Sequence, residues 1–409
     1  MATGGRGLRG ARRAVALTFG LLLLGLSAMG FQVRSAAAQD WVFGSKFTQT
    51  GTYNSNLLLN PDNKISAFGS ISVPEFKLER SGPTSKVVLG GKFTFAEYID
   101  HSSLNSQDQN GTLSIDKELS ERSKLGLEAS VDRDSTLTSD RDITGRFLNR
   151  PVHFVAFDVA PFWSYDLSPI DQIRLSPSFS AVNYADSPVE TDYRIYGGNL
   201  AYSHSLSELT QVTGNLSYYR FEPDDTQNSK TDIYGGLVGY RYTPSERLLL
   251  DGAVGLNYKV RTTDGSSGSG SSSDVGYRLK FNATYAIDDQ TKARLALSRD
   301  EEPSGNGRTI TRNRASIALS YQLSELTVLN LDASYADNEK IGGSSTQSSE
   351  GTSRYFSLKP SATWQITDRL SFAASYQFRH KRSDGGSATD NAAFITLRYS
   401  LQDQHWSGF

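Results

Sequence analysis

The feature that most constrains this chain is an alternation of apolar and polar residues that recurs from residue 41 onward. Residues 370–378 read Leu-x-Phe-x-Ala-x-Tyr-x-Phe, and similar runs flank polar turns at residues 206–208 and 323–325, where Leu-Ser-Glu repeats. Successive side chains of a β-strand point to opposite faces. The pattern therefore predicts many strands with one apolar and one polar face, joined as antiparallel hairpins.

The connections between these strands fall into two classes by length. Eight are short, and nine are longer and rich in Ser, Gly, Asp and Asn, the clearest being residues 264–274 and 338–353. The longer tracts carry too little apolar surface to order themselves, so we expect loops there. Together the connections define about 18 strands, with 16 as the alternative, from near Trp41 to near Leu401. The short turns are expected near residues 81–84, 120–123, 168–171, 207–210, 243–247, 287–291, 323–326 and 366–369.

Short turns on one side and long loops on the other are typical of bacterial outer-membrane barrels, which have an even number of strands. A soluble solenoid or propeller would show the same alternation. The asymmetry of the loops and an export signal at the N-terminus favour the membrane. We predict an all-β fold, a transmembrane antiparallel up-and-down β-barrel. The mean hydropathy of −0.43 agrees with such a barrel, because half of each strand would face water.

The first 38 residues have the layout of a secretory signal peptide. Four arginines occur within the first 13 residues, an apolar run extends from Ala14 to Phe31, and small residues precede Gln39. This order predicts cleavage after Ala38; the alternative is a membrane anchor, for which a run of this length is borderline. Residues 39–409 then form a single barrel domain with 37 basic and 44 acidic residues, a net charge of −7.

The composition leaves little room for catalysis. The chain has no cysteine and five histidines, so thiolate chemistry is excluded and acid–base candidates are few. His204 lies between two serines on the apolar register, but adjacent strand residues point to opposite faces, which disfavours a lipase-like Ser–His pair. Acidic loops, such as that of Asp224 and Asp225, could hold a protease-like pair or a cation, with solvated charge as the plainer interpretation. We predict no enzyme, no cofactor and no metal site.

Charge is unevenly distributed over the polar face of the strands. Taking every second residue as inward gives a basic series in the second half of the chain, opposed by Asp251 and Asp332 alone. Rings and ladders of charge set pore selectivity, and walls of low dielectric constant focus their field. The residues that we predict to contact anions are Arg241, Arg278, Lys280, Lys292, Arg294, Arg312, Arg314, Lys359, Arg379 and Arg398, with Lys259 on the same face.

The first half of the chain carries more acids than bases on this face. A basic wall would then face a mildly acidic one, with the strongest anion contacts expected at Arg278, Lys280, Arg294, Arg312 and Arg314. The alternative is that the charges neutralise one another in a water-filled lumen. The inward acids are Glu75, Glu79, Asp116, Glu118, Glu128, Asp132 and Asp158, against Lys46, Lys77, Lys92 and Arg174.

Several segments near the mature N-terminus carry a family resemblance. They are residues 53–57 (Tyr-Asn-Ser-Asn-Leu), 60–63 (Asn-Pro-Asp-Asn), 73–80 (Val-Pro-Glu-Phe-Lys-Leu-Glu-Arg), 81–83 (Ser-Gly-Pro) and 87–93 (Val-Val-Leu-Gly-Gly-Lys-Phe). With the repeated Leu-Ser-Glu turns, they resemble Gram-negative β-barrel porins of exopolysaccharide loci. The resemblance implies an outer-membrane location and a role in passing or assembling extracellular polysaccharide. It brings no catalytic residues.

Three functions remain open at this point. The first is a channel or porin-like barrel for an anionic solute or exopolysaccharide, since a barrel of this size is wide enough for an aqueous pore. The second is a scaffold barrel whose lumen holds a periplasmic partner, as in a secretion or electron-conduit component. The third and least favoured is a barrel enzyme. The expected partners are outer-membrane lipid, lipopolysaccharide, the barrel-assembly machinery and the polysaccharide or small anion, without nucleic acid, and both termini are expected in the periplasm.

Overall fold

The computed structural model describes residues 40–136, 152–185, 187, 190–265, 268–305, 307–340, 353–401 and 403–407, and the predicted signal peptide lies outside them. Within these residues, one short 3-10 helix, η1 (Ser102–Leu104), accompanies the strands, and no helix is long and apolar enough to cross a membrane. The strands are β1 (Asp40–Asn54), β2 (Ala67–Gly82), β3 (Ser85–Tyr98), β4 (Ser106–Ser120), β5 (Ser123–Ser135), β6 (His153–Ser168), β7 (Asp171–Tyr184), β8 (Tyr193–Ser207), β9 (Thr210–Pro223), β10 (Lys230–Ser245), β11 (Leu248–Gly265), β12 (Gly268–Ala286), β13 (Thr291–Ser304), β14 (Arg308–Ser324), β15 (Thr327–Lys340), β16 (Ser353–Gln365), β17 (Leu370–Ser383), β18 (Gly386–Ser400) and β19 (Gln404–Ser407).

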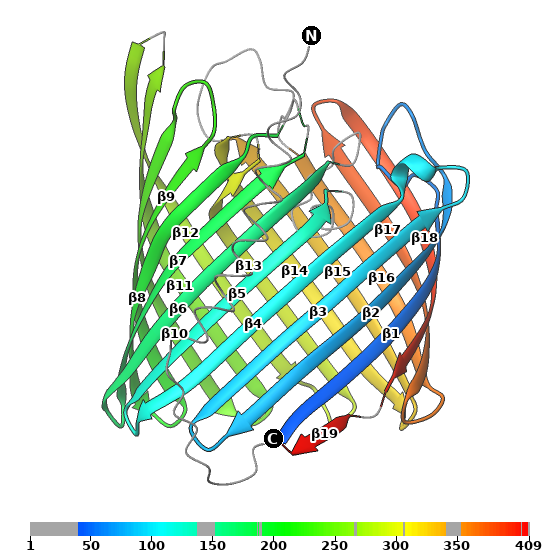
Figure 1. The fold of residues 1–409 in the computed structure, drawn as a ribbon, viewed down its shortest axis with the longest axis horizontal. Coiled ribbons are helices and arrows are strands. Elements are labelled where there is room, and N and C mark those ends of the chain that lie inside the picture. The colour runs from blue at the N-terminus through cyan, green and yellow to red at the C-terminus, as the bar shows by residue number, and fades with distance from the viewer. Residues whose placement is uncertain are drawn as a thin grey trace. The chain divides into compact units, whose positions relative to one another are not determined.

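From β1 to β18, each strand is antiparallel to its neighbours in the sequence and hydrogen-bonded to them. β18 also pairs with β1, from Lys46↔Ser400 to Asn54↔Ala392, and this pairing closes the sheet into a barrel of tilted strands (Figure 1). Closure removes the open edges that an isolated sheet would expose. The predicted 18-strand up-and-down barrel is confirmed.

The short strand β19 follows β18 and also pairs with β1 (Figure 1). β18 ends opposite Lys46, so the first residues of β1 extend beyond it. Leu401, just after β18, donates its backbone N–H to the carbonyl of Ser45 at 2.9 Å. The C-terminal segment thus continues the pairing along the part of β1 that β18 does not reach.

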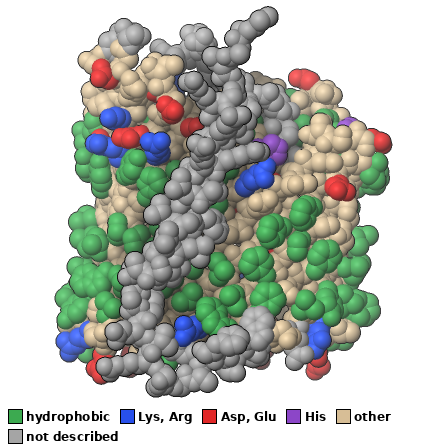
Figure 2. Space-filling model, viewed as in Figure 1, with side chains coloured by type: hydrophobic (Ala, Val, Ile, Leu, Met, Phe, Trp, Pro, Cys, Tyr) green, Lys and Arg blue, Asp and Glu red, His purple; other side chains and the backbone are tan. Residues whose placement is uncertain are grey.

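Large apolar side chains point out from the wall. Leu216 on β9, Val238 on β10 and Leu256 on β11 are each exposed, in positions where a soluble sheet would bury them. Figure 2 shows hydrophobic side chains spread over the middle of the outer face, with charged side chains nearer its ends. Exposed aromatic residues lie toward both ends of the strands: Tyr202, Tyr242, Tyr285, Tyr321, Trp364 and Tyr399 on the short-turn side, and Tyr53, Tyr196, Tyr218, Tyr234, Tyr258, Tyr277, Tyr335 and Tyr376 on the other.

The eight short turns lie where the sequence predicts them, and local hydrogen bonds explain why the chain turns there. A serine side-chain oxygen accepts a hydrogen bond from the backbone N–H two residues later at three of these turns, those of Ser120, Ser168 and Ser207. Asp288 accepts the N–H groups two and three residues later, at 2.8 and 2.6 Å. Ser and Asp favour turns through such bonds. The same donors hold the pKa of the Asp288 carboxyl below its ordinary value, because they stabilise its charged form.

Three connections at the opposite end differ from the prediction of nine long loops. Only two or three residues join β11 to β12, β13 to β14 and β17 to β18. The Gly-Ser tract is paired in register up to Gly265↔Gly268, so the expectation that it stays unordered is wrong. Adjacent backbones supply the hydrogen bonds of a ladder without any apolar side chain. Figure 1 shows this hairpin, yellow-green at the upper left, extending beyond its neighbours. In the predicted loop at 338–353, residues 341–352 lie outside the described part.

Candidate functional site

The inside of the barrel is the candidate site, because the strands place their polar register there. Arg278 illustrates the rule: it lies between Tyr277 and Leu279, which are exposed on the outer face. All ten basic residues predicted to contact anions belong to the inward register of strands β10 to β18. Alternation alone thus assigns their direction correctly, while their contact with anions stays a prediction.

Six of these ten basic residues have carboxylate partners across neighbouring strands. The expectation that Asp251 and Asp332 alone oppose the basic series is therefore wrong, and much of the predicted basic wall is neutralised. The pairs are Arg241–Asp251 at 2.9 Å, Arg278–Asp300 at 2.7 Å, Lys280–Asp300 at 3.8 Å, Arg314–Glu302 at 3.4 Å, Arg312–Glu302 and Arg379–Asp390.

Asp300, Glu302 and Asp390 are not among the inward acids predicted from the sequence. They lie within β13 and β18, whose alternation of inward and outward residues extends through them. Asp300 lies opposite Arg312 in the ladder, and Asp390 lies opposite Arg379. Residues directly opposite on one face of an antiparallel pair are close enough to interact. Extending the alternation from Arg294 and from Arg398 along the same strands would have found all three acids.

The other four basic residues have no ion pair within the described part of the chain. Lys292 and Arg294 lie near the start of β13, and Arg398 lies near the end of β18, so all three are close to the short-turn end. Lys359 lies farther into the barrel, with its ammonium 5.4 Å from the centre of the Phe394 ring. Three of these four basic residues therefore lie toward the short-turn end of the lumen.

The acidic half of the wall also divides into paired and unpaired residues. Glu75 pairs with Lys46 at 2.8 Å, and Glu79 pairs with Lys86 at the same distance. By contrast, Glu128 on β5 and Asp158 on β6 are exposed to the lumen and have neither an ion pair nor a hydrogen bond among the described residues. Their strands are adjacent, with Glu128 opposite Ala160 and Asp158 opposite Ser130, so the two carboxylates are diagonal neighbours.

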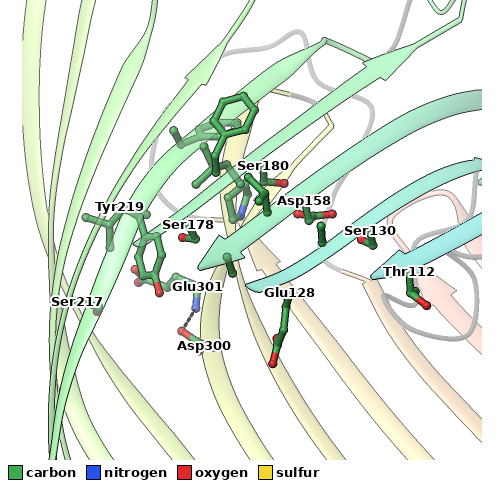
Figure 3. Close-up of a pocket in the computed structure, with 18 of the residues that line it drawn as sticks. Thr112, Glu128, Ser130, Asp158, Ser178, Ser180, Ser217, Tyr219, Asp300 and Glu301 are labelled. Atoms are coloured by element: carbon green, nitrogen blue, oxygen red, sulfur yellow. Dashed lines mark hydrogen bonds between the residues drawn. The ribbon is translucent and has the colours of Figure 1, made fainter. Parts of the chain in front are cut away.

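A cavity of about 800 Å³ lies along this part of the lumen. It is lined by inward residues of successive strands from β3 to β13, which include both unpaired carboxylates and the pair formed by Arg278 and Asp300 (Figure 3). Its other polar lining is dominated by hydroxyl groups. These come from Thr112, Ser114, Ser130, Ser178, Ser180, Ser217 and Tyr219.

At the long-loop end, the segment between β1 and β2 folds into the mouth of the barrel. Leu59, which has a positive φ of 47°, is buried against Ala336, Tyr355 and Ala388. These three residues belong to the inward registers of β15, β16 and β18. Leu57 is also fully buried, in a second cluster with β2, β3 and η1 residues. The segment is therefore packed inside the mouth. Figure 1 shows it in blue beside the β17–β18 hairpin.

A buried ion pair anchors this segment. Arg379 on β17 and Asp390 on β18 are both 0% exposed, and the Arg379 Nε donates to Asp390 Oδ2 at 3.0 Å. Arg379 Nη2 also donates to Asn54 Oδ1 at 3.0 Å, and the Asn56 backbone N–H donates to Asp390 Oδ1 at 2.7 Å. Ser55 Oγ adds a bond to the same carboxylate oxygen at 3.2 Å. The predicted anion contact Arg379 thus holds a structural pair.

His204 lies in a small cluster on the outer face near the short turns. Its Nδ1 is 2.7 Å from Asp171 Oδ1, and the Tyr202 hydroxyl donates to the same oxygen at 2.5 Å. Ser168 Oγ donates to Asp171 Oδ2 at 2.6 Å, so this serine bonds the acid rather than the histidine. A nucleophile must lie within hydrogen-bond reach of its base. The cluster therefore lacks the Ser–His contact of a lipase site.

Comparison with known proteins yields one family match. The model of the family described as "Protein of unknown function, DUF481" matches residues 172–349, which include β8 to β15. No curated protein matches the chain.

Solved structures of barrel proteins are similar in fold at low sequence identity. The ferric-catecholate import receptor Fiu of E. coli is 9% identical, with a TM-score of 0.47 over 87% of this chain and 81% of the receptor. The ferric citrate transporter FecA is 10% identical, with a TM-score of 0.48 over 85% of this chain, which spans 61% of the transporter. The outer membrane protein OpdK of Pseudomonas aeruginosa is 12% identical, with a TM-score of 0.46 over 89% of this chain and 99% of that protein.

Proposed function

We propose that this chain is an outer-membrane channel of a Gram-negative bacterium. The observation that carries the proposal is the reversed polarity of the barrel, with large apolar side chains exposed outside and charged residues inside. In a bilayer every backbone polar group must be bonded within the protein, and a closed barrel meets that condition. A charged, hydroxyl-rich lumen is suited to water and dissolved solutes.

The orientation in this proposal follows from the connections. Barrels of this class have short periplasmic turns and longer extracellular loops. The start of β1 and the strand β19 lie at the short-turn end (Figure 1). The proposal therefore puts both ends of the mature barrel domain in the periplasm. In this proposal, the exposed Tyr and Trp residues toward both ends of the strands would lie at the level of the lipid headgroups.

For the solute, the proposal is a small anion or a segment of an acidic exopolysaccharide. Lys292, Arg294 and Arg398, which have no ion pair among the described residues, lie near the proposed periplasmic mouth and would attract such a solute. The resemblance of residues 53–93 to porins of exopolysaccharide loci is what extends the proposal to polysaccharide. The paired Arg312 and Arg314 contribute less, because Glu302 offsets their charge.

A scaffold barrel with a filled lumen is the second candidate, and one observation favours it. Arg379 and Arg312 point inward near the long-loop end, yet they are only 0% and 5% exposed. That end of the lumen is therefore crowded. A scaffold barrel would fold and insert but pass no solute.

Solute flux through liposomes distinguishes the two candidates. We expect liposomes containing the purified mature barrel to swell faster than protein-free liposomes in isosmotic gluconate. The folded state is checked in the same sample by the shift in gel mobility on heating that barrels show. Swelling at the protein-free rate despite a folded barrel would contradict the channel and support the scaffold.

A further inference from the structure

The cavity beside β5 and β6 contains more acceptors than the wall can satisfy. Glu128 and Asp158 face it without a partner among the described residues, and the hydroxyls of Ser130, Ser178 and Ser180 lie near them in the lining (Figure 3). Carboxylates accept stronger hydrogen bonds from charged donors than from neutral ones. The lining is therefore prepared for a ligand that donates hydrogen bonds.

A second observation concerns buried groups in the same lining. Asn257 is 2% exposed, and its Oδ1 has no hydrogen-bond partner. The side chain of Glu301 is 4% exposed; its Oε1 accepts from Lys259 at 2.8 Å, whereas its Oε2 has no partner. A buried polar atom without a partner is unfavourable, because it has lost its hydrogen bonds to water. Both residues belong to the lining of the cavity.

The charges of the lining fix the sign of the ligand. The lining includes one cation, Arg278, whose charge is offset by Asp300 at 2.7 Å (Figure 3). Glu301 is offset by Lys259. Glu128 and Asp158 remain, so the cavity attracts cations although other parts of the lumen carry unpaired bases. Low-dielectric walls strengthen this attraction.

The same geometry selects an organic cation over a metal ion. Across the described part of the chain, no group of three or more His, Asp and Glu residues is placed to hold a metal. The volume of about 800 Å³ is that of a small-molecule site. An ammonium group has three N–H donors, which suits two carboxylates flanked by hydroxyls.

We propose that this cavity is a binding site for an organic cation with several N–H donors, of the polyamine class. Glu128 and Asp158 accept hydrogen bonds from the ammonium groups of the ligand, and the Ser hydroxyls serve the rest of it. The inference rests on the proposed open channel, through which the ligand reaches the cavity, and it goes beyond the proposed anionic solute by adding a binding site for a cation. The occupied cavity would then lower the open-pore current.

Spermidine is the probe for this site, measured in two ways on the purified mature barrel. In planar bilayers it should reduce the open-pore current, and in detergent it should bind by titration calorimetry. E128Q/D158N should weaken both effects by about tenfold to a hundredfold, because a neutral amide oxygen accepts a weaker hydrogen bond from a charged donor than a carboxylate does. D116N/E118Q is the matched control, because it removes two inward acids that are absent from the lining.

The outcomes separate this site from the channel. Calorimetric binding that is lost in E128Q/D158N and kept in D116N/E118Q supports the site, even if the barrel passes no current. Equal binding by wild type and E128Q/D158N would overturn it. A neutral oligosaccharide such as maltohexaose that binds as tightly as spermidine would also overturn it, because charge would then play no part.

Discussion

Two acidic sites in the same lumen behave in opposite ways. Asp390 is fully buried and accepts bonds from Arg379, Ser55 and the Asn56 backbone. Glu128 and Asp158 are exposed to the lumen and have no partner among the described residues. All three are carboxylates on inward registers. The difference teaches that pointing into the lumen does not by itself define the role of a charged side chain. A carboxylate with hydrogen-bond partners stabilises the structure, whereas a carboxylate without partners is available to solutes.

The largest effect is expected from breaking the buried pair of Arg379 and Asp390, and it falls on the stability of the barrel. Arg379→Ala leaves Asp390 buried without its counter-charge, which typically costs about 3–5 kcal/mol. It also removes the bond to Asn54, so the segment between β1 and β2 should leave the mouth. We expect a lower unfolding temperature in detergent, measured by the gel-mobility shift, and a larger single-channel current.

The double variant R379M/D390L tests whether these two effects have separate causes. Removing both charges should recover most of the lost stability, since no buried charge is left alone. The current should stay high, because Asn56 has lost its acceptor. A current equal to that of the wild type in both variants would mean that the segment does not narrow the mouth.

Neutralising the unpaired acids Glu128 and Asp158 is expected to have a smaller effect, which falls on the ion selectivity of the pore. In bilayers with a KCl gradient, E128Q/D158N should shift the reversal potential toward that of an anion-selective pore, with a change of a few-fold in the permeability ratio. Removing two unpaired negative charges from the lumen weakens its attraction for cations. K46Q/E75Q is the control, because it removes one charge of each sign from a pair at 2.8 Å and should leave the ratio unchanged.

A still smaller and opposite shift is expected at the short-turn end. K292Q/R294Q should reduce the relative permeability of gluconate by about twofold, because the proposed mouth is wide and salt screens charges beyond about 10 Å at 0.1 M. The shift should vanish at 1 M salt. A shift that persists at 1 M would indicate a narrow binding site at these residues.

The smallest effect is expected at the projecting β11–β12 hairpin. Deleting residues 263–265 and 268–270 removes three facing pairs of the ladder and keeps the register of the rest. The deleted part lies beyond Tyr258, which belongs to the outer aromatic set. We expect current and unfolding temperature to match those of the wild type. A clear loss of stability would assign the hairpin a role in the wall.

The alternation of residues, the connections between the alternating runs and the export signal together predicted the barrel and its 18 strands. Alternation alone predicted that the ten basic residues point inward. Composition misled the prediction at the Gly-Ser tract, where backbone hydrogen bonds rather than apolar contacts order the chain. The inward acids Asp300, Glu302 and Asp390 were not predicted, although the alternation along β13 and β18 places them on the same face as Arg294 and Arg398. The anchored segment depends on contacts such as Asn56 with Asp390, which are more than 330 residues apart, and no local pattern encodes it.

The most direct test of the central claim is the current through the purified wild-type barrel in planar lipid bilayers. An open lumen with unpaired charges predicts discrete current steps whose reversal potential in a salt gradient differs from zero and moves toward zero as salt is raised. A barrel that is folded and inserted, yet gives no current steps at any voltage, would contradict the account.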